Sequence, residues 1–165
     1  MNVFHALGFS GQQYFCPIRP RPGEKPRFWH DSPAHVEVFA HARDIIVPDP
    51  RSNTLPVFAP ASGVITQLVQ HHTRWGQDHS FLPYLNYLTV QTLVLGEFYQ
   101  ICHIGTNSCL FKIGDTIKAS VQIATTGVNG YMTDVRHIHM LVGIYTRKNS
   151  QGFVSVRIRW QEATV

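Results

Sequence analysis

The sequence predicts an all-β domain built from antiparallel strands, with few or no helices. Apolar residues gather in short runs, and Gly, Pro, Asn or Asp bounds most of them. No stretch shows the 3.6-residue apolar period of an amphipathic helix. A length of 165 residues suits one domain with its own core, so we expect residues 1–165 to form a single domain.

The expected strands follow the apolar runs in chain order. They are Val36–Phe39, Asp44–Val47, Leu55–Phe58, Val64–Val69, Tyr87–Leu95, Phe98–His103, Thr116–Lys118, Val121–Thr126, His137–Tyr145 and Phe153–Trp160. Between two of these runs, His71–Tyr84 contains Gly76, Asp78 and Pro83, which favour a long loop. Loops of this length often form a wall of a binding groove.

The two ends of the chain differ from its centre. Residues 1–35 are expected to form an extended arm, because Tyr14–Pro33 is rich in proline and arginine and such backbone lies over a core rather than forming helix. Residues 36–146 would be the domain core. Residues 147–165 would add one strand, in which Arg157–Trp160 has a solvated basic face rather than a nucleic-acid site.

Composition excludes several classes of protein. A hydrophobic content of 44% with 15% charged residues argues against disorder, and no apolar run approaches 18 residues, so no membrane span is expected. The net charge of +4 suits an anionic partner without choosing one. No aromatic-basic motif of a nucleic-acid-binding fold occurs, so no nucleic-acid partner is expected. Met1–Gly11 lacks the pattern of a secretory signal.

The three cysteines are odd in number and lack Cys-x-x-Cys spacing. This count argues against a disulfide framework and against a thiolate zinc site.

Histidines offer a different kind of site. His137 and His139 stand two apart in an apolar run, and residues two apart in a strand point to the same face. Imidazole is a common zinc ligand, although such a pair is also common as hydrogen-bonded core or surface histidine. Asp44 can equally cap a turn, and His103 can be an ordinary strand-end histidine.

Four sequence blocks, taken in order, resemble the LytM and lysostaphin-like zinc endopeptidases, which share the duplicated hybrid motif, a barrel-sandwich hybrid fold. Asp44–Pro48 with Leu55–Ile65 is similar to the family's Asp-Ile-Ala-Ala-Pro and Thr-Pro-Val-Tyr-Ala-Pro-Ala-Asp-Gly-Val-Val. The further blocks are Tyr99–Ile104, similar to Tyr-x-x-x-His-Leu; Gly114–Gly130, similar to the family's Gly-Asp block that ends in Gly-x-Thr-Gly; and His137–Met140, similar to His-Leu-His-Phe.

The resemblance implies a zinc ion (Zn2+) held by His41, Asp44 and His139, with a metal-bound water as nucleophile. It also implies that His103 and His137 act on the water and the oxyanion. The family's usual substrate is the peptide cross-link of bacterial peptidoglycan. A secreted or cell-envelope location is therefore expected.

The first ligand departs from the family spacing. The family has His-x-x-x-Asp, whereas this chain has Ala40 at that position and His41 three residues before Asp44. In a regular strand this parity points His41 to the face opposite Asp44. A bulge or a tight turn could re-aim His41 toward the metal, and this is the outcome we expect. The alternative is a lost ligand and a non-catalytic domain that binds the cell wall or activates an enzyme.

Overall fold

The computed structural model describes residues 3–19, 27–29, 32–47, 54–132 and 136–161, and all structural statements refer to these residues. Strands dominate, which confirms the all-β prediction. The helical segments are short: α1 (Val3–Ala6) and the two 3-10 turns η1 (Glu37–Phe39) and η2 (His79–Tyr84). No helix in this part of the chain has the length and apolar character needed to cross a membrane.

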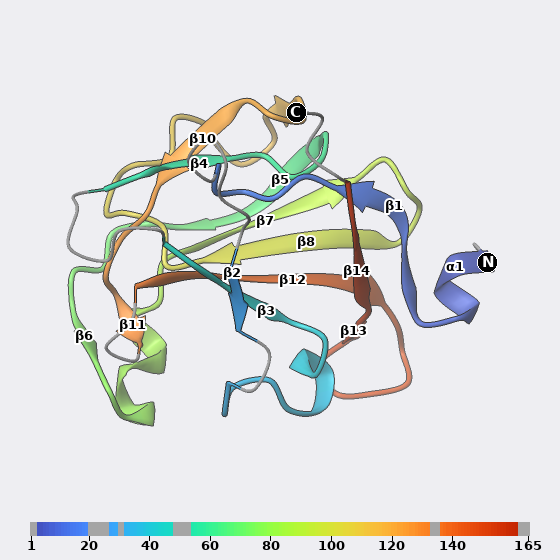
Figure 1. The fold of residues 1–165 in the computed structure, drawn as a ribbon, viewed down its shortest axis with the longest axis horizontal. Helices are drawn as coiled ribbons and strands as arrows, with labels where there is room; N and C mark the ends of the chain where they lie inside the picture. Colours follow the sequence, from blue (N-terminus) through green and yellow to red (C-terminus); the bar gives the residue numbers. More distant parts are fainter. Residues whose placement is uncertain (1–2, 20–26, 30–31, 48–53, 133–135, 162–165) are drawn as a thin grey trace.

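One antiparallel sheet forms the body of the domain (Figure 1). Its strands run side by side in the order β2 (Arg27–Trp29), β3 (Arg43–Ile46), β12 (His137–Tyr145), β8 (Glu97–Cys102), β7 (Tyr87–Thr92), β5 (Gly63–Val69) and β9 (Thr116–Ile117). A further strand, β13 (Phe153–Ser155), pairs with the second half of β12. The sheet thus brings the His-x-His strand, β12, directly beside the strand of Asp44, β3.

Three two-stranded ribbons complete the fold. They are β1 (Phe9–Tyr14) with β14 (Arg157–Trp160), β4 (Pro56–Phe58) with β10 (Gln122–Thr125), and β6 (Trp75–Gly76) with β11 (Gly130–Tyr131). In Figure 1, the β4–β10 ribbon and β1 lie above the sheet, and β14 crosses in front of its strands. The ribbon β6–β11 lies at the other side of the sheet, next to η2.

The main core lies on one face of the sheet because the side chains of β12 alternate. Ile138, Met140 and Val142 are completely buried among the core residues, together with side chains from β1, β4 and β10. His137 and His139 share the opposite face. The apolar face of β12 therefore packs into the core, while the face that carries the two histidines is turned toward the site described below.

Two predicted strands differ in the structure. Val36–Phe39 is not a strand: Glu37 has a left-handed backbone (φ 50°) and the amides of Phe39 and Ala40 bond to carbonyls three residues back, which makes the 3-10 turn η1. Phe153–Trp160 is not one strand but two. It divides at Val156, where β13 ends its pairing with β12 and β14 begins its pairing with β1.

The N-terminal segment is tied to the sheet through a buried carboxylate. Glu97, at the start of β8, is completely buried. Its Oε1 accepts a hydrogen bond from the Tyr14 hydroxyl at 2.6 Å, and its Oε2 lies 2.6 Å from His5 Nε2 and also accepts from the Gly11 amide. β1 and α1 are therefore packed parts of the domain, and Tyr14 is itself a core residue.

Candidate metal centre

Asp44 and His139 meet because their strands place them opposite each other. In the antiparallel register of β12 and β3, His139 pairs with Asp44. Directly opposed residues project to the same face of a sheet. The Nδ1 atom of His139 lies 2.9 Å from Oδ1 of Asp44, and the aspartate is buried.

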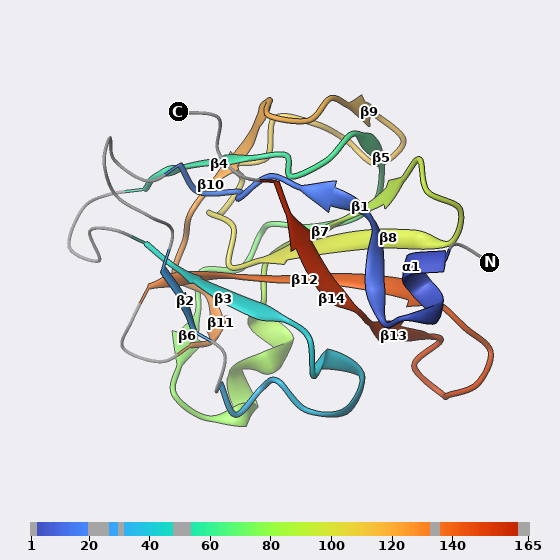
Figure 2. The ribbon, with the colours of Figure 1, turned by 45° about the vertical axis from the view of Figure 1, so that its right-hand side comes forward.

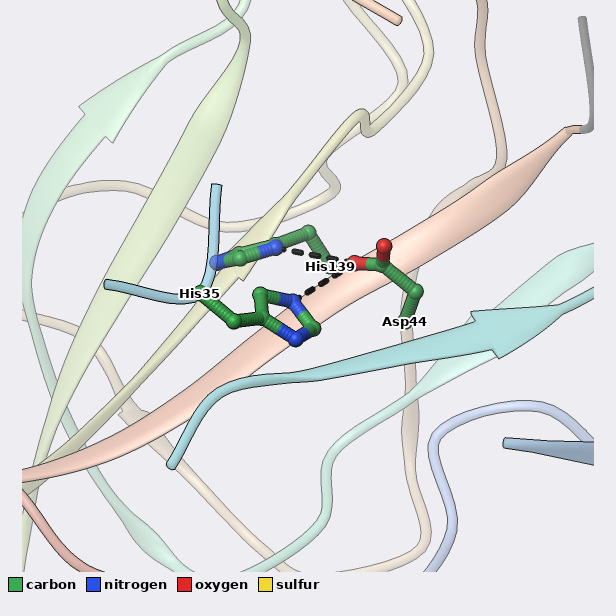
Figure 3. A group of neighbouring side chains, drawn as sticks. All are labelled: His35, Asp44 and His139. Atoms are coloured by element: carbon green, nitrogen blue, oxygen red, sulfur yellow. Dashed lines mark hydrogen bonds and ion pairs between the residues drawn. The ribbon is translucent and has the colours of Figure 1, made fainter. Parts of the chain in front are cut away.

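A third side chain, His35, completes the group. It comes from the segment before η1, and its Nε2 lies 3.2 Å from the same Asp44 oxygen, Oδ1. Its ring packs against that of His139 with centroids 5.1 Å apart, and its side chain is almost entirely buried. Figure 3 shows both imidazoles converging on the carboxylate. One ligand atom from each of the three residues lies within 4.8 Å of the others.

These three donors fit a zinc ion. Two imidazoles and one carboxylate are a ligand set that suits catalytic zinc and leaves a fourth position for water or substrate. Tetrahedral bonds of 2.0–2.1 Å place neighbouring donor atoms about 3.3 Å apart. The separations of 2.9 and 3.2 Å from Asp44 to its two partners are of this size.

The carboxylate is held in its ionised form. Burial alone would raise the pKa of Asp44, but the hydrogen bonds from His139 and His35, with the nearby His137, outweigh burial and hold the pKa well below its usual range. An ionised carboxylate is the form that binds metal. The site therefore needs no change of protonation at Asp44 to act as a ligand.

Two further histidines lie beside this group. His137 Nε2 is 3.7 Å from Asp44 Oδ1, and the ring of His137 stands edge-on to that of His103 with centroids 4.8 Å apart. Both residues are buried. Burial first, and then the neighbouring His137, lower the pKa of His103 to about 3, so that its imidazole is neutral near pH 7.

The tautomer of His103 follows from its partner. Its Nδ1 lies 2.9 Å from the carbonyl oxygen of Asn129. A carbonyl oxygen only accepts, so Nδ1 carries the proton and donates it, which leaves Nε2 with a free lone pair. His103 also has a left-handed backbone (φ 63°), a conformation that costs a non-glycine residue about 1–3 kcal/mol.

Asn129 braces this conformation from three directions. Its side-chain Nδ2 donates to the Ile104 carbonyl at 2.8 Å, and its Oδ1 accepts from the Asn86 amide at 2.8 Å. The backbone amide of His103 in turn donates to the Asn86 carbonyl. Asn129 occupies the position of the threonine in the family's Gly-x-Thr-Gly segment. Asn129, which stands in place of that threonine, therefore links the end of β8 to the start of β7.

The segment His71–Tyr84, predicted as a long loop, carries β6 and η2 in the structure. Arg74 donates to the Tyr84 hydroxyl at 2.6 Å, and the His79 ring packs on that of Tyr131 with centroids 4.8 Å apart. Because Tyr131 follows Asn129 by two residues, this aromatic and basic segment lies next to the brace that holds His103.

The structure brings four of the five predicted site residues together: Asp44, His103, His137 and His139. It does not bring His41 to them. The backbone amide of His41 donates to the Ser155 hydroxyl at 3.1 Å, and burial first, and then the charges of Arg157 and Arg43, lower the pKa of His41. The expected return of His41 to the site is not seen: His41 lies in the turn between η1 and β3, before β3 begins its pairing with β12 at Arg43, and it is not among the grouped donors.

His35 was missed by reasoning from the sequence. It precedes Asp44 by nine residues, outside the family spacing, and lies next to a proline-rich segment. Only the turn at η1 returns the chain so that His35 faces the carboxylate. No spacing rule in the sequence signals this contact.

The chain resembles known proteins in its fold rather than in its sequence. No sequence model of a protein family matches the chain, and no curated protein sequence matches it. Solved structures do match its fold, which is that of the LytM and lysostaphin-like M23 peptidases.

Three solved structures illustrate the likeness. The catalytic domain of the antimicrobial peptidase lysostaphin from Staphylococcus simulans is 19% identical, with a TM-score of 0.50 over 70% of this chain and 74% of that one. The M23 metalloprotease pseudoalterin is 14% identical, with a TM-score of 0.54 over 90% and 92%. A zinc-containing peptidase from Vibrio cholerae is 18% identical, with a TM-score of 0.52 over 79% of this chain and 36% of that one.

Proposed function

We propose that the chain is a zinc-dependent endopeptidase that hydrolyses peptide cross-links of bacterial peptidoglycan. The observation that carries this proposal is the group His35, Asp44 and His139, with its donor atoms within 4.8 Å of one another. We assign the first histidine ligand to His35 in place of His41. The fold supports the proposal, since proteins that share it are named peptidases.

The metal would supply a Lewis acid that polarises the peptide carbonyl and lowers the pKa of water. His35 Nε2, Asp44 and His139 Nδ1 would hold it, and the ionised carboxylate would offset its positive charge. Near pH 7 these donors are available without loss of a buried proton from Asp44, because its pKa lies well below the usual range.

His103 would orient the attacking water in this reaction, since a pKa of about 3 makes its imidazole a weak proton acceptor near pH 7. Its Nδ1 proton is engaged by the Asn129 carbonyl, so Nε2 is the atom that can accept a hydrogen bond from the water. His137, whose Nε2 lies near Asp44, would donate to the oxygen on which negative charge develops. The left-handed backbone of His103 and the Asn129 brace hold the His103 ring in place before substrate binds.

The non-catalytic alternative rested on a missing third ligand. With only Asp44 and His139, the site would offer too few side chains to hold zinc against water. His35 supplies the third donor from outside the family motif, which favours the enzyme over a wall-binding module.

The test begins with protein purified without chelator or added zinc. We expect about one zinc per chain by mass spectrometry, and release of new amino groups from purified peptidoglycan. Treatment with 1,10-phenanthroline should stop the release, and zinc should restore it. Bound zinc without any new amino groups would instead support the non-catalytic module, and new reducing sugar ends would show that the glycan is cleaved.

A further inference from the structure

A cluster of positive charge lies outside the metal centre, where β3 and β14 begin. Arg43 is the first residue of β3 and Arg157 is the first residue of β14. Arg43 pairs with Met140 of β12, and Val156, the residue before Arg157, donates its amide to Val142 of the same strand at 2.9 Å. The His41 amide donates to the Ser155 hydroxyl at 3.1 Å. The pKa of Arg43 is lowered first by burial and then by the charge of Arg157, and both arginines lower the pKa of His41. Arg159 follows on the same face of β14, about 6.5–7 Å along the strand. We call His41, Arg43, Arg157 and Arg159 the basic surface.

No carboxylate of the described residues compensates these charges. The side chain of Arg43 donates to the carbonyl of its neighbour Ala42 at 2.6 Å, and Arg159 donates to the Ser10 carbonyl at 3.3 Å. The ion pairs found among the described residues all involve histidine rather than arginine. Arg43 is half-buried and Arg157 is exposed, and two nearby positive charges repel each other.

The arginines of β14 are also held in place before any ligand arrives. The guanidinium carbon of Arg159 lies 3.7 Å above the ring of Phe4, and that of Arg157 lies 5.7 Å from the ring of Phe9. The parallel pairing of β1 with β14 sets Phe9 beside Arg157. Stacking engages the flat face of a guanidinium and leaves the N–H groups on its edge available.

Figure 2 shows β14 crossing the front of the sheet, with β1 and α1 beside it. Parity along β3 separates the basic surface from the metal centre, because Arg43 and Asp44 are consecutive and project to opposite faces. A ligand on this surface would therefore leave the face of Asp44 and His139 accessible.

We propose that the basic surface binds the phosphodiester groups of an anionic polymer that carries no bases. Guanidinium groups match phosphate with paired hydrogen bonds, and a row of them suits repeated charges better than a single anion. An arginine guanidinium lies over one face of the Phe4 ring and one face of the Phe9 ring, so a base cannot stack on those two faces. The inference goes beyond the peptidase reaction and does not depend on it.

The test measures binding of fluorescent poly(glycerol phosphate) to the full chain by anisotropy at several salt concentrations. The double variant Arg43→Gln/Arg157→Gln should bind at least tenfold more weakly. The slope of log affinity against log salt should fall by about 1.5, since two phosphate contacts are lost. Arg157→Lys keeps the charge but not the planar fork of the guanidinium. Its affinity should lie between that of the wild type and that of the double variant.

The matched control is Arg19→Gln, which removes a cation elsewhere. Arg19 lies over the Phe58 ring at 3.8 Å and donates to the Ser120 carbonyl. The Arg19→Gln variant should keep near wild-type affinity. Thermal melting should show that all variants are folded. Equal losses in Arg19→Gln and in Arg157→Gln alone would overturn the proposal, because net charge alone would then explain binding. Tighter binding of poly-glutamate or of single-stranded DNA would also overturn it.

Discussion

His139 and Asp44 face each other across β12 and β3, and His139 Nδ1 lies 2.9 Å from Asp44 Oδ1. The two residues are 95 positions apart in the sequence, and their strands place one imidazole and one carboxylate side by side. The sheet register fixes both backbones, so His139 and Asp44 form a rigid pair. His35, which comes from a connecting segment, completes the group of three.

His35 and His41 should differ in their effect on metal. His35→Ala removes one of three donors around Asp44, and zinc affinity should fall by more than about 100-fold. His41→Ala removes an imidazole that lies near Arg43 and Arg157, and zinc content should stay at the wild-type level. Zinc per chain after dialysis against a competing chelator measures both. Loss of zinc in His41→Ala with retention in His35→Ala would reverse the assignment.

Substitutions of the two histidines in the His-x-His pair should also differ in their effects on zinc content and on hydrolysis. His139→Ala should lose zinc, because its Nδ1 is one of the three grouped donors. His137→Ala should retain most of its zinc and lose hydrolysis, because its Nε2 lies farther from Asp44 Oδ1, at 3.7 Å. Metal content and amino-group release would be measured on the same preparations. Equal metal loss in both variants would contradict these roles.

Asn129→Ala should weaken both the fold and the position of His103. Two buried hydrogen bonds lose their partner, which should lower the free energy of unfolding by about 2–3 kcal/mol. We expect kcat to fall more than KM rises, because the brace holds the histidine that orients the attacking water. Urea unfolding and steady-state rates would be compared.

Asn149→Ala is the control for this variant, since its side chain makes a comparable pair of bonds far from His103. It should cost stability and leave kcat unchanged. A normal kcat in Asn129→Ala would show that the brace is dispensable for catalysis.

The free energy of unfolding should depend on pH through the protonation of His103. The pKa of His103 is about 3 in the folded chain, against about 6.5 when unfolded. Below pH 6.5 the unfolded chain therefore binds a proton that the folded chain does not, so stability is lost as pH falls toward 3. Between pH 7.5 and roughly pH 5 the loss from this residue should be about 2 kcal/mol.

His103→Asn tests this dependence, because asparagine does not titrate there and tolerates a left-handed backbone. Urea unfolding in the presence of chelator, at several pH values, should show a flatter curve for the variant. Parallel curves for the two proteins would contradict the depressed pKa.

Glu97→Ala should loosen the N-terminal segment. The buried carboxylate bonds to Tyr14 and His5, and its removal leaves their polar groups without that partner, at a cost of about 3 kcal/mol. Limited proteolysis should then cut within residues 3–14. Glu37→Gln, at an exposed site, should leave the digestion pattern unchanged. An unaltered pattern in Glu97→Ala would show that the β1–β14 pairing holds the segment alone.

The sequence by itself determined the strand-dominated fold and most of the site. The two-residue spacing of His137 and His139 inside an apolar run is a local property, so it predicts a strand in which the two histidines share one face. The order of four short blocks predicted the partners Asp44 and His103. Parity also indicated that His41 would turn away from Asp44 unless a bulge intervened.

Only the tertiary structure decided which histidine joins Asp44 and His139 in the group of three. His35 reaches Asp44 through the turn at η1, whose path depends on packing against β13 rather than on any local periodicity. The division of Phe153–Trp160 at Val156 was decided in the same way, because β14 pairs with β1 from the opposite end of the chain. Contacts between distant segments have no period in the sequence, whereas the side-chain alternation of a strand does.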